Sequence, residues 1–220
     1  TNNSSSTSYN DGMIIKLENI ELNNPIVTNT EGIGGSNSDY INSVASTSDG
    51  GAIVGGYFYS SIQVGEYTLT SSGEYDGMII KYNNSGEVGW ARSVGGGSSD
   101  RIQSVVETND GGVIVGGYFS SSSIQVGEYK LTSSGGYDGM IIKYNSRGEV
   151  EWARSVGGSG SDYIYSVAET SDGGAIVGGY FYSSSIQIGE YTLTNNSSST
   201  SYTDGMIIKY NSRGEVEWAR

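Results

Sequence analysis

Cysteine and histidine are both absent from this chain of 220 residues. Without them the chain can form no disulfide framework, no Cys/His zinc site, no cysteine nucleophile and no Ser-His-Asp triad. Basic residues are few: 11 Lys and Arg stand against 24 Asp and Glu, which gives a formal net charge of −13. This balance argues against nucleic acid or anionic lipid as a partner, because both reward clustered Lys and Arg.

Long apolar runs are also absent. No stretch of 18 apolar residues occurs, so we expect no membrane insertion. The sequence does not open with a charged segment followed by an apolar one, so we expect no signal peptide in it. One proline stands against 35 glycines and 18 tyrosines. A composition rich in Gly, Tyr, Ile and Val but poor in Pro favours short strands and tight turns over disorder.

The most informative feature that is present is an internal repeat. The string DGMIIK occurs four times, at intervals of 65, 62 and 66 residues. Two other strings, DGG[AV]IVGGYF and IQ[VI]GEY, each occur three times at matching spacing. The 17 residues 138–154 are identical to residues 204–220. The chain is therefore a tandem array with a unit of about 62 residues.

Each unit is predicted to contain four strands and a small accessory hairpin. In the middle unit we expect the strands at Arg101–Glu107, Val113–Phe119, Met140–Tyr144 and Val150–Val156. The accessory hairpin is expected at Ile124–Leu131, and no helical period of 3.6 residues is seen. Four antiparallel strands per repeated unit describe a β-propeller blade, so the predicted fold class is all-β, a β-propeller. A β-solenoid is the alternative.

Counting the strands gives about three and a half blades. We predict a partial blade of third and fourth strands over 1–38, and complete blades over 39–98, 99–160 and 161–220. A closed ring needs at least four blades, so the ring is expected to be incomplete in one chain. The expected partners are other copies of the chain, or further blades of the same array. A fragment of a longer propeller and an engineered repeat are both compatible with this count.

Two sets of residues are candidates for binding. Asp39, Asp100 and Asp162 lie in the Gly/Ser loops between predicted blades, where carboxylates beside Ser and backbone carbonyls could bind Ca²⁺ or cap backbone N–H groups. The candidate ligand-binding tyrosines end the predicted second strands or precede the third strands: Tyr59, Tyr75, Tyr118, Tyr137, Tyr182 and Tyr202. Tyr among Ser, Asn and Gly supplies the stacking and hydrogen bonds of glycan or protein recognition. The alternative is that these rings only cover the sheet ends.

No catalytic group of residues is recognisable. A glycosidase needs two carboxylates in different environments, whereas acidic residues repeated in every unit have similar environments. A catalytic residue is expected in one unit only, and departures between units are few. Arg101 is one of them, because Tyr40 and Tyr163 stand at its position in the other units. We therefore expect a protein that is not an enzyme and has no cofactor; a hydrolase or lyase is the alternative.

The run DGMIIKYNSRGEVEWARSVGGSGSDYIYSVAETSDGGAIVGGYF resembles the bacterial propeller repeats often called SBBP. The resemblance covers nearly the whole chain. It implies strands in the last unit at Ile164–Glu169, Ala175–Tyr182, Met206–Tyr210 and Val216–Arg220. Together with the acidic composition, it implies an extracellular or cell-surface module for binding, adhesion or assembly. A lectin-like propeller with one weak glycan site per blade is the alternative.

Overall fold

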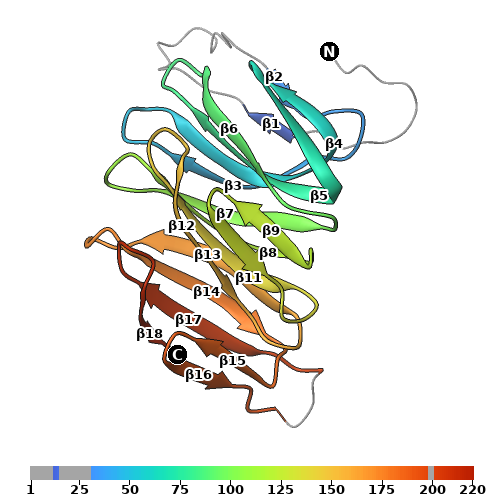
Figure 1. Cartoon of the computed structure of the whole chain (residues 1–220). Coiled ribbons are helices and arrows are strands. Elements are labelled where there is room, and N and C mark those ends of the chain that lie inside the picture. The colour runs from blue at the N-terminus through green and yellow to red at the C-terminus, as the bar shows by residue number, and fades with distance from the viewer. Residues whose placement is uncertain (1–11, 15–30, 198–200) are drawn as a thin grey trace, which may run out of the picture.

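The computed structural model describes residues 12–14, 31–197 and 201–220, and the regular structure in them consists of β-strands (Figure 1). Three four-stranded antiparallel sheets follow one another along the chain. The first blade is β3 (Tyr40–Ser46), β4 (Ala52–Val64), β5 (Tyr67–Tyr82) and β6 (Val88–Val94). The second is β7 (Asp100–Glu107), β8 (Val113–Phe119), β11 (Asp138–Tyr144) and β12 (Val150–Val156). The third is β13 (Asp162–Glu169), β14 (Ala175–Phe181), β17 (Asp204–Tyr210) and β18 (Val216–Ala219).

The accessory hairpins lie beyond the ends of the second and third strands. They are β9 (Ser123–Val126) with β10 (Tyr129–Thr132), and β15 (Ser185–Ile188) with β16 (Tyr191–Thr194). In the first blade the hairpin is the outer part of the long strands β4 and β5. Each hairpin turns at a glycine with positive φ, such as Gly127 at 58°, a conformation that residues with a Cβ rarely adopt. The accessory hairpin predicted over Ile124–Leu131 is therefore confirmed.

A two-stranded sheet precedes the first blade. Its strands β1 (Gly12–Ile14) and β2 (Glu31–Ile33) pair with Gly12 opposite Ile33. Gly77 faces Val94 in the same way in the first blade. The pair therefore matches the third and fourth strands of a blade. Residues 1–11 and 15–30 of the predicted partial blade over 1–38 lie outside the described part of the chain.

Neighbouring blades pack by a repeated contact between valine and glycine. A Cβ added to Gly55 would overlap a methyl group of Val105 on the second blade. The same overlap would occur between Gly116 and Val167 on the third blade. Since a side chain at either glycine would separate the sheets, these glycines set the close approach of each second strand to the first strand of the next blade.

The outer strands are joined by tryptophan. The indole N–H groups of Trp90 and Trp152 donate to the carbonyls of Ser146 and Ser212 on the next blade, at 3.1 and 3.0 Å. Both rings are buried. The first strand of each later sheet, β7 or β13, makes most of the contacts with the preceding sheet, chiefly with its first and second strands. Sheets that converge at their first strands are the blades of a propeller, so the predicted fold class, a partial β-propeller, is confirmed.

In the described part of the chain, packing positions stay exposed at both ends of the row of blades, although β2 covers part of the first blade (Figure 1). Val44 holds the position of Val105 and Val167 but is 59% exposed, against 6% and 8%. At the other end, a Cβ added to Gly178 would meet nothing within 4 Å. The valine and glycine positions that pack between the inner blades therefore have no packing partner at Val44 and Gly178 among the described residues.

Candidate ligand-binding site

Ten tyrosines gather at one end of the blades, and we call them the tyrosine surface. They are Tyr40, Tyr57, Tyr59, Tyr75, Tyr118, Tyr137, Tyr163, Tyr165, Tyr180 and Tyr182. Strand pairing brings them together because residues directly opposite in an antiparallel pair point to the same face. Tyr40 is opposite Tyr57, and Tyr163 is opposite Tyr180. The repeat therefore places rings at equivalent points of successive blades.

The rings contact each other within and between blades. Tyr118, on the second blade, meets Tyr163 of the third blade with ring centroids 4.8 Å apart and Tyr137 of its own blade at 5.4 Å. Tyr57 stacks on Tyr40 at 4.8 Å. Offset and edge-to-face pairs at these separations add about 0.5–1.5 kcal/mol each beyond their buried area. The surface is therefore firmly held, and its rings are oriented before a ligand arrives.

The structure brings together five of the six predicted ligand-binding tyrosines. Tyr59 and Tyr75 contact each other, and Tyr118, Tyr137 and Tyr182 belong to the group on the second and third blades. Tyr202 does not join them. Its side chain is 67% exposed, and its carbonyl accepts the Asn195 side-chain amide. An additional residue accounts for the different position of Tyr202. Tyr75 and Tyr137 directly precede the Asp of DGMIIK, whereas Thr203 separates Tyr202 from that Asp.

Tyr165 joins the surface through a β-bulge. The pairing of β13 with β14 shifts between Ile164 and Ser166, which leaves Tyr165 as the extra residue. Its ring stacks on Tyr180 at 5.3 Å, and the two hydroxyls lie 3.2 Å apart. Strict alternation along the strand gives no signal of this position.

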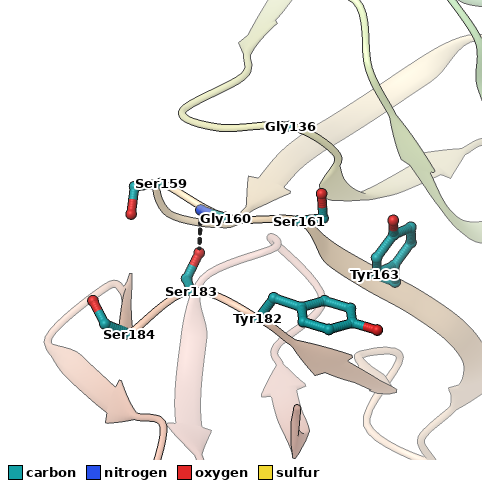
Figure 2. Close-up of a pocket in the computed structure, with 8 residues that line it drawn as sticks. All are labelled: Gly136, Ser159, Gly160, Ser161, Tyr163, Tyr182, Ser183 and Ser184. Atoms are coloured by element: carbon teal, nitrogen blue, oxygen red, sulfur yellow. Dashed lines mark hydrogen bonds between the residues drawn. The ribbon is translucent and has the colours of Figure 1, made fainter. Parts of the chain in front are cut away.

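A pocket of about 620 Å³ opens between the second and third blades, next to the tyrosine surface (Figure 2). Its lining residues are Gly136, Ser159, Gly160, Ser161, Tyr163, Tyr182, Ser183 and Ser184. Figure 2 shows the Tyr163 and Tyr182 rings at one end and Ser159 with Ser184 at the other. The Gly160 N–H donates to the Ser183 hydroxyl at 2.9 Å, which fixes the two loops relative to each other. The lining thus combines aromatic rings, hydroxyls and glycine backbone, and it holds no charged side chain.

Replacements between the blades explain why the pocket lies at this blade interface. Gly136 holds the position of Glu74, whose carboxylate accepts the Ser99 hydroxyl at 2.8 Å between the first and second blades. Tyr182 holds the position of Ser120, whose hydroxyl donates to the Ser99 carbonyl at 2.8 Å. A glycine in place of a glutamate opens the space, and a tyrosine in place of a serine gives it an aromatic wall.

Asp162 lies directly beneath the pocket and is fully buried. One carboxylate oxygen accepts the N–H of Tyr182 and of Ser183, both at 3.1 Å. The other accepts the Gly158 N–H and the Ser183 hydroxyl, both at 2.7 Å. Asp100 makes the equivalent four hydrogen bonds one blade earlier. These aspartates therefore hold the interblade loop to the end of the second strand.

The predicted calcium role finds no support in this geometry. At Asp100 and Asp162 the neighbouring groups are hydrogen-bond donors, which suit an anion and would repel a cation. Asp39 accepts the N–H groups of Gly35 and Tyr59. Throughout the described residues, no group of three or more His, Cys, Asp or Glu side chains is placed to hold a metal ion. Capping of backbone N–H groups, the alternative that the sequence leaves open, is the role that these contacts support.

Burial raises the pKa of Tyr57 and of Tyr163 above the ordinary value for a phenol, so these two hydroxyls stay neutral at physiological pH. A neutral phenol both donates and accepts hydrogen bonds. The surface can therefore offer rings for stacking and hydroxyls for polar contacts at the same time.

Comparisons with known proteins agree with the repeat architecture. The chain is 32% identical over 126 residues to an uncharacterised WD repeat-containing protein of Acanthamoeba polyphaga mimivirus. The match covers 51% of this chain and 9% of that protein, so the chain corresponds to less than a tenth of the relative's length. WD repeats form four-stranded propeller blades, which is the architecture found here. No protein-family model matches the chain, and membership of the SBBP-like repeats stays a prediction. Among the described residues, no helix has the length and apolarity that crossing a membrane requires.

Proposed function

We propose that this chain is a non-enzymatic propeller module that binds a saccharide on the tyrosine surface, with the pocket between the second and third blades as its centre. The observation that carries the proposal is the lining of the pocket: two tyrosine rings, four serines and two glycines. Aromatic rings stack against the apolar faces of sugars, and hydroxyls exchange hydrogen bonds with sugar hydroxyls. Neutral residues do both without the desolvation cost of a buried charge.

The arrangement of carboxylates supports a role in binding over catalysis. A glycosidase needs one carboxyl group as an acid and a second as a nucleophile or base facing the same bond. Asp162, the acidic residue directly beneath the pocket, is closed off by four hydrogen bonds. No acidic side chain lines the pocket itself. The acidic, cysteine-free composition and the repeat resemblance support a location outside the cell or at its surface.

We also propose that further blades of the same repeat, from another copy or from the same array, cover the two end faces. Val44 and Gly178 have the same local structure as the valines and glycines that pack between the inner blades. Sedimentation equilibrium is expected to show reversible association that weakens when Val44 is changed to Asp. A monomer at every concentration tested would contradict this proposal.

Saccharide binding is tested with a glycan array on which the wild-type chain is compared with two variants. Tyr182→Ser takes the residue that the second blade has at this position, Ser120, so the fold is expected to survive. Thr192→Lys is the matched control, because the second blade holds Lys130 there and the position is exposed on the accessory hairpin. We expect wild type and control to bind the same glycans, and Tyr182→Ser to lose at least tenfold in affinity. Equal binding by all three, or a silent array at high protein density, would refute the proposal.

A further inference from the structure

Arg101 is the one cation at the centre of the tyrosine surface among the residues that the structure describes. Its guanidinium carbon lies 4.5 Å from the centroid of the Tyr57 ring and 5.5 Å from that of Tyr75. A guanidinium at these distances is attracted by the negative faces of the rings. The first and third blades hold Tyr40 and Tyr163 at this position, so the cation belongs to the second blade.

The polar groups of Arg101 have no anionic partner within the described part of the chain. Its Nε is buried and makes no hydrogen bond. Some other cations of this acidic protein are paired: Lys143 lies 3.1 Å from Asp110, and Lys209 lies 2.7 Å from Asp172. A buried donor without an acceptor keeps an uncompensated desolvation cost, so a ligand that supplies the acceptor regains that free energy. Arg101 therefore has the donors and the charge to receive an anion.

A continuous path of rings joins Arg101 to the pocket. Tyr118 lies directly opposite Arg101 in the pairing of β7 with β8, and it meets Tyr163 of the pocket at 4.8 Å. From Tyr163 the path continues to Tyr180 at 5.2 Å and then to Tyr182 at 6.0 Å. Tyr118 itself is only 8% exposed, so a ligand seated in the pocket would stack on Tyr163 and pass Tyr118 to reach the guanidinium.

We propose that the ligand is a saccharide that carries a carboxylate, with one sugar in the pocket and its acidic sugar bound by Arg101. This inference rests on the proposed saccharide-binding function and names the class of saccharide. The planar guanidinium matches a carboxylate through two parallel N–H···O bonds. Tyr57 and Tyr75 hold the guanidinium in place, which lowers the entropy lost when the carboxylate binds. At physiological salt the Debye length is about 8 Å. Carboxylates of the protein that lie farther than this from Arg101 therefore repel an acidic ligand only weakly.

The test uses two oligosaccharides of the same length and linkage, one built of galacturonic acid and one of galactose. Affinities are measured by titration calorimetry at 150 mM salt for wild type and three variants: Arg101→Tyr, Arg101→Lys and Tyr182→Ser. Arg101→Tyr takes the residue that two other blades hold at this position, so loss of the fold is not expected. Arg101→Lys keeps the charge but removes the planar pair of donors.

We expect wild type to bind the acidic oligosaccharide at least tenfold more tightly than the neutral one. Arg101→Tyr should lose that preference while it keeps its affinity for the neutral compound. Arg101→Lys should keep part of the preference, and Tyr182→Ser should weaken both compounds by a similar factor. Wild-type binding without a preference for acid, or a preference that survives in Arg101→Tyr, would overturn this inference alone. Tighter binding of an acidic peptide of equal charge would also overturn it. Failure of both oligosaccharides to bind, with the glycan array silent as well, would refute the proposed function itself.

Discussion

Two buried aspartates in neighbouring blades should respond in opposite ways to the same substitution. Asp162 and Asp138 are 0% and 1% exposed, so burial does not distinguish them. Asp162 accepts four hydrogen bonds, two at each oxygen. Asp138 accepts the Ser134 N–H at one oxygen, and its other oxygen is buried without a partner. Replacing each by asparagine removes the charge and turns one acceptor oxygen into a donor.

The magnitude follows from counting the donors that lose an acceptor. In Asp162→Asn the new amide faces two donors, and each unsatisfied donor costs about 1–3 kcal/mol, so we expect a loss of about 2–6 kcal/mol. In Asp138→Asn the oxygen can keep the Ser134 N–H, while the amide takes the place of the unpartnered oxygen. Burial raises the pKa of the Asp138 carboxyl, so its charge opposes folding at neutral pH. Removing that charge should therefore leave stability within about 1 kcal/mol of wild type or raise it.

The assay is urea unfolding at pH 7, followed by the fluorescence of the three tryptophans. We expect the unfolding midpoint to fall clearly in Asp162→Asn and to stay close to wild type in Asp138→Asn. Asp100→Asn should behave like Asp162→Asn, because it loses the same set of contacts one blade earlier. Equal losses at Asp138 and Asp162, or a larger loss at Asp138, would refute the argument that the donors around the carboxylate decide the outcome.

Three further predictions concern blade packing and charge. Gly116→Ala should destabilise by about 1–3 kcal/mol, because the new methyl overlaps the next blade, whereas Gly178→Ala should be neutral or slightly stabilising in thermal unfolding. A cost at Gly178 equal to that at Gly116 would contradict the packing. Trp152→Phe should lose about 0.5–1.5 kcal/mol with its hydrogen bond to the next blade, and Trp218→Phe, on the end face, should lose less in the same assay. Burial alone would raise the pKa of Asp110, but its hydrogen bonds lower it to about 2. Its contribution to stability is thus complete above pH 4 and is lost as the pH falls towards 2, which carbon-detected NMR titration of the carboxyl checks; an ordinary value near 4 would oppose it.

The strands were predictable because every unit repeats the same turn chemistry and apolar runs. The expected strand Val113–Phe119 is observed with the same bounds, and Val150–Val156 is as well. Asp-Gly dipeptides and glycines with positive φ end the strands in each copy, so a local signal determines each boundary. The three copies of the unit therefore predict the same strands.

The candidate site was only partly predictable, because it depends on differences between copies and on contacts between blades. The sequence does not predict Tyr163 as a site residue, because its ring partner Tyr118 lies 45 residues away on another blade. Tyr165 depends on a bulge that the strand pattern does not reveal. The exchange of Glu74 for Gly136 matters only because the two loops face equivalent serines. None of these contacts is local in sequence, so the sequence pattern could not predict them.

The central claim, that the tyrosine surface is a ligand-binding site, is tested most directly by a crystal structure of the chain with a bound oligosaccharide of galacturonic acid. We predict sugar rings against Tyr163 and Tyr182 in the pocket, and a carboxylate within hydrogen-bond distance of the Arg101 guanidinium. A ligand bound on another face of the blades, with the pocket filled by water alone, would contradict the account.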